Sequence, residues 1–249
     1  MQIVTIANQK GGTAKSTTAA ALAQAAAYRG RRTLAIDLDP QGNLSLFLEA
    51  NTAHAGAFEV LEGAPATEAI QRIAGGLDAI AASWNLQTIS SGRGTARRLK
   101  AALEPIADRY DLIFIDTPPT AGELQYNALM AATDLIIPLQ ADIVGLQGLY
   151  QMADTARQIQ QSNPALKLTG IVLTRHGSRS TLARQMAETI KGKAAEMGIP
   201  FLTAIREAVA IREAQTLQRS LYEYAPNCKP AADYLELLDM ITAKGEGKP

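Results

Sequence analysis

The chain has 249 residues, and its 24 lysines and arginines balance 24 aspartates and glutamates, so its formal net charge is zero. This length suffices for one sizeable hydrophobic core, and the charge balance gives no sign of a strongly basic nucleic-acid binder, although it is compatible with a local basic face. A single cysteine, Cys228, excludes a disulfide framework, and the absence of a signal-peptide pattern or of an apolar stretch of ~20 residues favours a cytoplasmic protein without a membrane span.

Short β-branched, apolar runs alternate with longer helical stretches along the chain. In order, the pattern predicts strand 2–7, helix 15–28, strand 32–38, a weaker strand 77–82, helix 95–108, strand 112–115, helix 123–132 and strand 135–139. It continues with helix 146–161, strand 168–173, helix 181–197, a short apolar run at Phe201, and helices 208–218 and 230–243. Such an alternation is typical of an α/β fold with a parallel, twisted sheet covered by helices on both faces. We expect a single domain over residues 1–249, with residues 51–76 as a surface excursion.

A glycine-rich turn lies between the first predicted strand and the first predicted helix, which is where a phosphate-binding loop occurs. Its residues are Lys10, Gly11, Gly12, Thr13, Ala14, Lys15, Ser16 and Thr17. Glycines let backbone N–H groups turn toward phosphate oxygens, and the helix N-terminus adds a positive dipole. In such a loop Lys15 would neutralise the β- and γ-phosphates, Ser16 would join a Mg²⁺ shell, and Thr17 would hold the α-phosphate.

The loop departs from the common G-x-x-x-x-G-K-[ST] pattern, because Gln9 replaces its first glycine and Ala14 its second. The alternative interpretation is a glycine-rich turn with incidental lysines. The position, the spacing and the Ser-Thr pair that follows favour a phosphate loop instead. We expect the Ala14 methyl group to affect the hydrolysis rate more than nucleotide binding.

Two further predicted strands end in aspartate. Asp37 and Asp39 close the second strand, and carboxylates two residues apart lie on the same side of an extended chain. At the carboxyl edge of a parallel sheet they would face the ligand crevice, although Asp, Pro and Gly also form ordinary strand-ending turns. The apolar run 112–115 ends in Asp116, which is a Walker B pattern in which the aspartate holds Mg²⁺ through water; a generic strand end is the alternative.

Residues 8–17 resemble the deviant Walker A motif of the ParA/MinD superfamily of P-loop ATPases, whose hallmark is an additional lysine, here Lys10. Residues 37–43 are similar to the family segment D-x-D-P-Q-G-N, and residues 116–119 to its Asp-Thr-Pro-Pro form of Walker B. Gln9 resembles the ParA branch more than the MinD branch, which usually has glycine there. The likeness covers nearly the whole chain and is weakest over 51–76.

The resemblance implies a P-loop NTPase that binds ATP and Mg²⁺ and forms an ATP-dependent homodimer. Lys10 would reach the phosphates held by the partner subunit, so that Lys10, Lys15 and Asp39 are the expected catalytic residues. In this family's pattern Asp39 positions or activates the attacking water, and Asp37 supports the Mg²⁺ shell together with Ser16 and Asp116. Hydrolysis would be slow without a partner.

The resemblance also assigns residues to the rest of the nucleotide. Pro118 would begin the loop that senses the γ-phosphate, and Thr174, Arg175 and Arg206 would lie where the family holds the base and ribose. The family's I-P-R-N-V is Ile-Arg-Glu-Ala-Val at residues 205–209, so the adenine contacts are open.

ParA-like proteins are DNA-segregation ATPases, and the resemblance implies nonspecific DNA and a ParB-like protein as partners. Residues 175–219 contain eight basic and four acidic side chains, a local charge of +4 in a neutral protein, which favours a DNA face there. The residues that we assign to it are Arg179, Arg184, Lys191, Lys193 and Arg219. The ATP-bound protein would then associate with the nucleoid.

Two alternatives keep the ATPase and change its cargo. One is a membrane-positioning ATPase of the MinD kind, which carries a basic amphipathic C-terminal helix; here that region contains Asp233, Glu236 and Asp239. The other is a ParA-like ATPase that positions a protein cargo. A metabolic relative with a metal cluster would need interface cysteines that the lone Cys228 does not supply.

Overall fold

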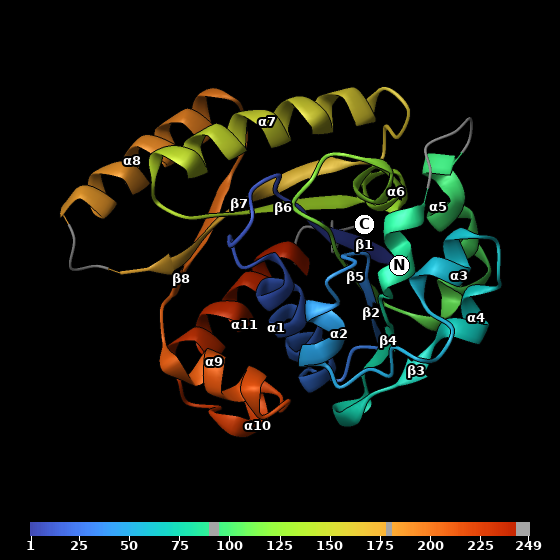
Figure 1. Ribbon diagram of the computed structural model, residues 1–249. Helices are drawn as coiled ribbons and strands as arrows, with labels where there is room; N and C mark the ends of the chain where they lie inside the picture. The colour runs from blue at the N-terminus through green and yellow to red at the C-terminus, as the bar shows by residue number, and fades with distance from the viewer. Residues whose placement is uncertain (90–94, 178–180, 243–249) are drawn as a thin grey trace, which may run out of the picture.

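A computed structural model describes residues 1–89, 95–177 and 181–242. Within them, the strands form one eight-stranded sheet in the order β3-β4-β2-β5-β1-β6-β7-β8 (Figure 1). The pairs are parallel except β3–β4, which is antiparallel. The strands are β1 (Gln2–Ile6), β2 (Thr33–Asp37), β3 (Gln71–Arg72), β4 (Asp78–Ile80), β5 (Leu112–Asp116), β6 (Asp134–Leu139), β7 (Lys167–His176) and β8 (Phe201–Arg206). The predicted parallel sheet is confirmed, with one short antiparallel edge strand added.

Helices cover both faces of this sheet. The α-helices are α1 (Lys15–Tyr28), α2 (Asn43–Phe47), α3 (Ala57–Leu61), α4 (Ala66–Ala69), α5 (Arg98–Leu103), α6 (Glu123–Ala131), α7 (Ile143–Gln160), α8 (Thr181–Glu196), α9 (Val209–Thr216), α10 (Leu221–Tyr224) and α11 (Lys229–Thr242). In the part of the chain that the structure describes, four short 3₁₀ turns join them: η1 (Ala74–Gly76), η2 (Trp84–Thr88), η3 (Thr95–Arg97) and η4 (Glu104–Arg109). Helices α1, α2 and α9–α11 lie on one side, and α3–α8 on the other (Figure 1).

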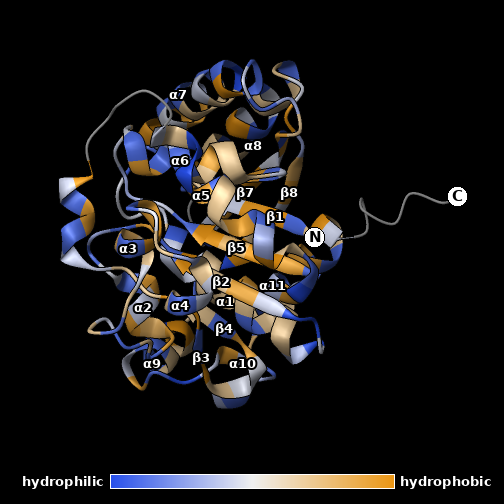
Figure 2. Cartoon of the chain, turned by 90° about the vertical axis from the view of Figure 1, so that its right-hand side faces the viewer, coloured by the Kyte–Doolittle hydropathy of each residue, from blue (hydrophilic) through white to orange (hydrophobic). Residues whose placement is uncertain are grey.

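The alternation of side chains along each strand builds two layers of core. Val4 and Ile6 pack with α1 and α11, whereas Ile3 packs on the opposite face. The strands are correspondingly hydrophobic in the middle of the molecule (Figure 2). Helix α1 is alanine-rich, which favours helix formation, and its small buried side chains let it pack directly on the sheet.

Two expectations about the chain were wrong. Residues 51–76 are not a surface excursion, because they form α3, α4 and β3 and bury side chains such as Val60 and Leu61 in the core. These helices are too short to show a periodic pattern. The single helix expected over 95–108 is instead η3, α5 and η4, since Pro105 lacks the N–H that would continue an α-helix.

Among the described residues, the helices lack the combination of length and apolar character that crossing a bilayer requires.

Candidate nucleotide site

The phosphate loop joins β1 to α1, and β1 lies between β5 and β6 in the middle of the sheet. Gly12 and Ala14 both take the left-handed backbone conformation, with φ of 76° and 65°. A Cβ atom on Gly11 or Gly12 would meet no other atom within 4 Å. The space beside these two glycines is therefore open to a ligand. Ala14 precedes the first turn of α1 and gives it no side-chain cap, which leaves the first N–H groups of the helix for an anion.

Two side chains from neighbouring strand ends hold the carbonyl groups of this loop. Gln140, which follows β6, donates its Nε2–H to the Gly12 carbonyl oxygen at 2.9 Å. The Thr174 hydroxyl, near the end of β7, lies 3.1 Å from the Thr13 carbonyl oxygen. Because the C=O and N–H of a trans peptide point in opposite directions, these contacts turn the N–H groups of Thr13 and Ala14 the other way.

Lys15 lies at the base of the loop and is only 6% exposed. Its Nζ donates to the Lys10 carbonyl oxygen at 3.2 Å, and an ammonium has three donors, so it retains capacity for phosphate oxygens. Burial lowers the pKa of Lys15, and the carboxylates of Asp116 and Asp39 oppose that shift. The lysine therefore lies in a field of negative charge that helps to keep it protonated.

Asp37 is buried and shapes the turn that carries Asp39. Its Oδ2 accepts from the Ser45 N–H and hydroxyl, both at 2.8 Å, and its Oδ1 accepts from the Asp39 N–H at 3.0 Å. Burial raises the pKa of Asp37 to about 6. Asp39 in turn accepts at Oδ1 from the Gln41 N–H at 3.0 Å. This geometry leaves the Asp39 Oδ2 for a water or ligand, whereas a Mg²⁺ role for Asp37 stays a prediction.

Of the three carboxylates at this sheet edge, Asp116 is the one best suited to hold Mg²⁺. It is fully buried, and in the β2–β5 pairing it lies opposite Asp37. Its Oδ1 accepts from the Thr117 N–H at 3.0 Å, whereas its Oδ2 has no hydrogen-bond partner among the described residues. Burial and the Asp37 charge raise the pKa of Asp116 well above its ordinary value, while the Ser16 hydroxyl and the Lys15 ammonium oppose that rise. A buried carboxylate oxygen without a donor is what a cation would satisfy.

The donor set also fits magnesium rather than a cation held by protein ligands alone. In the described parts of the chain, no three acidic, histidine or cysteine side chains converge as a metal cage. Mg²⁺ usually binds through one or two carboxylates plus substrate phosphates and keeps several waters. Asp116 and the Ser16 hydroxyl, next to an open phosphate loop, supply such a partial shell.

The Lys10 side chain extends to the start of α7 rather than into the loop of its own chain. Its Nζ lies 3.1 Å from a carboxylate oxygen of Asp142. Asp142 also caps α7, since its Oδ1 accepts from the Gly145 N–H at 2.6 Å. Both Lys10 and Asp142 side chains are partly exposed, by 24% and 41%, so that a second molecule has access to this pair.

A cavity of about 140 Å³ continues from the phosphate loop toward β8 and α9. It is lined by residues that include Ala14, Thr17, Thr174, Arg175, Arg206, Ile211 and Gln215. Arg206 is tied to the buried Asp233 of α11, because its Nε donates to both carboxylate oxygens at 3.0 and 3.1 Å. The cavity brings the three expected base and ribose residues together, and their contacts with a nucleotide stay predictions.

Pro118 is buried two residues after the end of β5. The residue before it, Thr117, donates its hydroxyl to the Ile6 carbonyl oxygen at 2.9 Å, which fixes the start of this loop to the end of β1. Its predicted role as a γ-phosphate sensor is compatible with that position and stays a prediction.

Comparison with known proteins assigns the chain to a family. A family model described as an AAA domain matches residues 1–168. The chromosome-partitioning ATPase Soj of Thermus thermophilus is 33% identical, over 97% of this chain and 95% of that protein. The chromosome partitioning protein ParA of Caulobacter vibrioides is 35% identical, over 98% of this chain and 95% of that protein. This chain belongs to the Soj/ParA family.

A solved structure supports the P-loop fold of this Soj/ParA-family chain. Cobyrinic acid a,c-diamide synthase from Mycobacterium smegmatis, with bound ADP and magnesium, superposes with a TM-score of 0.84 at 31% identity. The match covers 100% of this chain and 97% of that one. The predicted fold class is therefore confirmed over the full length.

Several of the basic side chains that we assigned to DNA contact neighbouring side chains of the same helix. On α8, Lys191 pairs with Glu188 at 2.9 Å and Lys193 pairs with Glu196 at 2.8 Å. Arg184 on the same helix is exposed and within 3.3 Å of the Thr181 hydroxyl. The local positive charge of α8 is therefore smaller than its count of lysines and arginines indicates.

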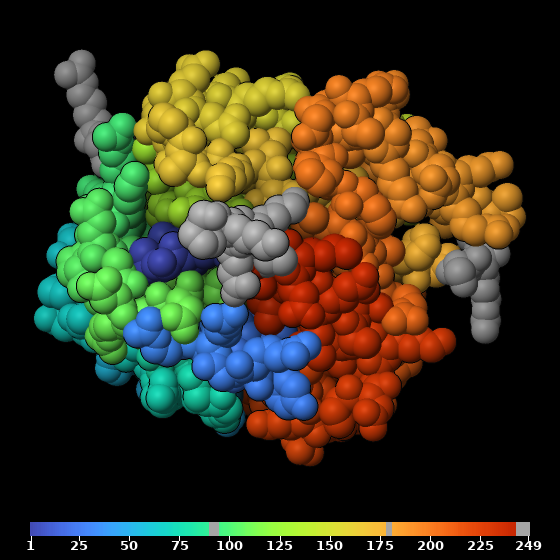
Figure 3. Space-filling view, turned by 180° about the vertical axis from the view of Figure 1, so that it is seen from behind, coloured from blue at the N-terminus to red at the C-terminus, as the bar shows by residue number. Residues whose placement is uncertain are grey.

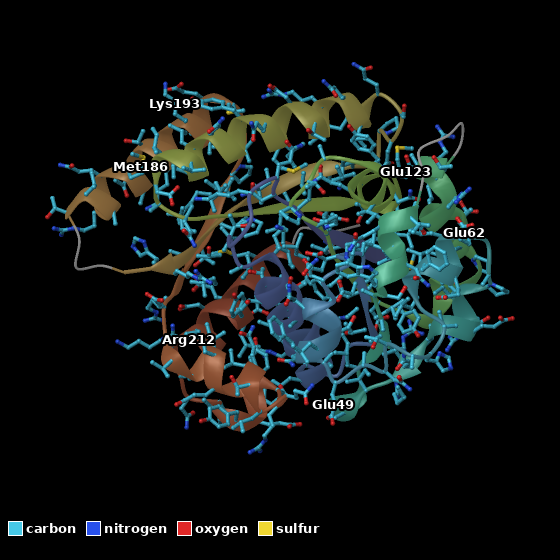
Figure 4. All side chains as sticks on the ribbon, viewed as in Figure 1. Glu49, Glu62, Glu123, Met186, Lys193 and Arg212 are labelled. Carbon is cyan, nitrogen blue, oxygen red and sulfur yellow. The ribbon has the colours of Figure 1, made fainter. Side chains whose placement is uncertain are left out.

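The assigned DNA residues also do not form one patch. Helix α8 lies at the opposite end of the molecule from α10 in Figures 1 and 2, and Figure 4 places Lys193 on α8. Arg219 lies two residues before α10. In the space-filling view, the amber to orange segment of α8 and the red C-terminal helices occupy different parts of the surface (Figure 3). Arg179 lies outside the described residues.

Several site residues escaped the sequence-based prediction. Gln140 holds the phosphate loop, and Asp142 pairs with Lys10. Ser45 donates to Asp37, and Gln215 donates to the Thr17 hydroxyl at 3.0 Å. Gln140 and Asp142 follow a predicted strand end, which is the signal that could have found them. Ser45 and Gln215 lie on helices without a local signal.

Proposed function

We propose that this chain is an ATP-dependent partition ATPase that segregates DNA. In this proposal an ATP–Mg²⁺ homodimer binds DNA without sequence preference, and a ParB-like protein stimulates hydrolysis and release. The observation that carries the proposal is the meeting of the open phosphate loop, the buried Lys15 and the carboxylates of Asp39 and Asp116 at one sheet edge, in a Soj/ParA-family chain.

The residues of the site divide the work of phosphoryl transfer to water. The N–H groups of Thr13 and Ala14 and the Lys15 ammonium would hold and neutralise phosphate oxygens. Mg²⁺, when bound, would be held by Asp116 and Ser16 and would offset charge on the phosphates. The Asp39 Oδ2 would accept a hydrogen bond from the attacking water and orient it. Because positioning dominates this chemistry, a partner that improves the alignment of Asp39 would accelerate a slow basal reaction.

Two features support the dimer and the cargo. The partly exposed Lys10–Asp142 pair lies beside the loop, where a second subunit has access to it. The relatives that match nearly the full chain are named for chromosome partitioning. In this proposal the protein works in the cytoplasm and associates with the nucleoid only while it holds ATP.

The deciding experiment measures binding of the full chain to nonspecific duplex DNA with ATP, ADP or no nucleotide, in Mg²⁺ and across a salt series. We expect binding only with ATP, and we expect it to weaken by about tenfold or more between roughly 50 and 200 mM salt, because phosphate contacts release counterions. Asp39→Ala, which should bind ATP without hydrolysing it, prolongs the bound state. Lys15→Ala, which should bind no nucleotide, is the matched negative control.

The other outcomes separate the alternatives. ATP-dependent dimerisation without DNA binding would discard the DNA role and leave a protein cargo, to be sought next. ATP-dependent binding to anionic vesicles would favour the MinD-like alternative. If the chain does not bind ATP at all, the proposed ATPase activity itself is wrong.

A further inference from the structure

A second cavity lies on the same face of the sheet as α1. Its volume is about 270 Å³, compared with about 140 Å³ for the cavity that continues from the phosphate loop, and the two have no lining residue in common. The C-terminal half of α1, the end of α2, the turn η1 and the segment between α9 and α10 form its walls. Glu49, at the bottom of Figure 4, lies on its rim. This size is close to that of small-molecule sites, which start at roughly 300 Å³.

Two helix ends shape the backbone around this cavity. Four non-glycine residues in the described parts of the chain have positive φ angles. Ala14 and Arg175 line the cavity beside the phosphate loop, whereas Glu49 and Gln218, with φ of 55° and 50°, line the second cavity. Glu49 and Gln218 each follow the last turn of a helix, α2 and α9, where a left-handed residue commonly ends a helix. The N–H groups of the next residues, Ala50 and Arg219, bond back to the Ser45 and Ala214 carbonyl oxygens, both at 2.9 Å. These two closed helix ends form one wall of the second cavity.

The lining chemistry suits an organic cation. Tyr28 and Phe47 contribute aromatic surface, and Tyr28 is 62% exposed and held by stacking on Tyr222 at 5.5 Å between ring centroids. Glu49 and Glu223 add two carboxylates, and within the described chain neither has an ion-pair partner.

The third charged side chain of the lining is Arg219, so the cavity has a net charge of −1. Aromatic faces and unpaired carboxylates together favour a cationic group on an apolar stem.

The cavity is connected to the nucleotide site through two helices. Gln218 donates to the Leu46 carbonyl oxygen of α2 at 2.9 Å, and α2 follows directly on the segment that contains Asp39. On α9, Gln215 donates to the Thr17 hydroxyl of the phosphate loop at 3.0 Å. A ligand that moves α2 or the α9–α10 segment would therefore move groups at the nucleotide site.

We infer that this cavity binds an organic cation, a guanidinium or primary ammonium group on a short apolar stem, and that its occupancy alters the affinity of the nucleotide site. The first half stands on the cavity alone, whereas the second rests on the proposed ATP-binding function. The cation can come from a free polyamine or from a basic side chain of a partner protein.

Calorimetry on the full chain without nucleotide tests the binding half. The probes are butylguanidinium and butylurea, which have the same shape and differ in charge. We expect butylguanidinium to bind about tenfold more tightly, because charged hydrogen bonds to the carboxylates add to the aromatic contact. The double variant Glu49→Gln, Glu223→Gln should remove this preference, and Glu68→Gln, an exposed glutamate outside the cavity, should retain it. Equal binding of the two probes, or a preference that survives the double variant, would overturn the site.

A second pair of probes identifies the source of the cation. Tighter binding of spermidine than of acetyl-Leu-Arg-Leu-amide would support a free polyamine, and the reverse order a protein partner. The regulatory half is measured as the affinity for a fluorescent ATP analogue with and without saturating butylguanidinium. A change of about fivefold or more that the double variant abolishes is expected, and an unchanged affinity would overturn it. A chain that binds no ATP analogue at all would fail the proposed function, while the cation titration would still decide the cavity.

Discussion

Asp116 shows how a single buried carboxyl group links stability to the proposed metal. Its pKa is raised by burial and by Asp37, and no donor satisfies its Oδ2 within the described chain. A carboxyl whose folded pKa exceeds its unfolded value binds protons more tightly in the folded state. The folded state is therefore favoured at low pH and loses this advantage as the pH rises through the raised pKa. The same sign holds for Asp37, whose pKa is about 6.

This sign gives a prediction for the protein without nucleotide. Asp116→Asn removes the buried charge and keeps an acceptor for the Thr117 N–H. We expect its melting temperature at pH 8 to exceed that of the unmodified chain by about 2–4 °C, which corresponds to roughly 1 kcal/mol at this length. The difference should shrink toward pH 4, where the carboxyl is protonated. Thermal melts from pH 4 to 8 measure it, and a difference that does not change with pH would contradict the argument.

The same variant has a second expected effect, on the metal. Added Mg²⁺ and ATP together should stabilise the unmodified chain by linkage and should stabilise Asp116→Asn much less. Ordinary stabilisation of the variant would remove Asp116 from the Mg²⁺ shell.

The shape of the phosphate loop is decided by the ends of two other elements. Gln140 follows β6 and Thr174 belongs to β7. Each side chain donates a hydrogen bond to one carbonyl oxygen of the loop. The Thr174 hydroxyl also lies 3.2 Å from the Leu139 carbonyl oxygen, so it connects β6, β7 and the loop. The loop's N–H groups thus point toward the ligand space because the sheet edge holds their carbonyls from behind.

This arrangement predicts a clear difference between two substitutions at one position. Thr174→Val has nearly the same shape and lacks the hydroxyl, so the Thr13 and Leu139 carbonyl oxygens lose the one donor that they share. We expect it to weaken ATP binding about tenfold, in line with the loss of roughly 1.4 kcal/mol for a buried hydrogen bond. Thr174→Ser keeps the hydroxyl and should bind nearly as well as the unmodified chain. Calorimetric titration with ATP and Mg²⁺ measures both, and equal affinities for Val and Ser would show that the hydroxyl does not position the loop.

For the whole molecule, the Lys10–Asp142 pair relates the single chain to the proposed dimer. In the single chain Lys10 is neutralised by Asp142 at 3.1 Å. To contact nucleotide in a partner subunit, Lys10 has to leave this pair. Because the pair is partly exposed, its own contribution to stability is small, typically ~0–1 kcal/mol, and a phosphate of the partner's ATP can replace it.

Substitution of Lys10 therefore should separate nucleotide binding from dimerisation. Lys10→Ala in the Asp39→Ala background should bind ATP within about threefold of the parent, yet remain monomeric in sedimentation velocity with ATP and Mg²⁺, since the attraction across the interface is lost. The parent with Lys10 intact is the dimeric control. A variant that dimerises normally would rule out the interface role of Lys10.

Most strands and the phosphate loop can be predicted from local sequence patterns. The apolar runs that become β1, β2, β5, β6 and β7 are continuous, and the phosphate loop occupies a short contiguous segment, so both are visible in sequence. Ala14 occupies the position of the second glycine of the common loop pattern, and it takes the left-handed conformation that a glycine favours. The predictions of one helix over 95–108 and of a surface excursion over 51–76 were wrong. One proline interrupts the first segment, and the helices of the second are too short to show a helical period of apolar residues.

The amino-acid sequence by itself determined the P-loop fold class, the family resemblance and the identity of the loop and strand-end carboxylates, because each depends on neighbours in the chain. Only the tertiary structure decided that Gln140 and Thr174 hold the loop and that Ser45 holds Asp37. It also decided that α8 and Arg219 lie apart and that Tyr28, Glu49 and Glu223 line one cavity. These relations join residues far apart in sequence, and packing of helices onto the sheet, which no local pattern specifies, brings such residues together.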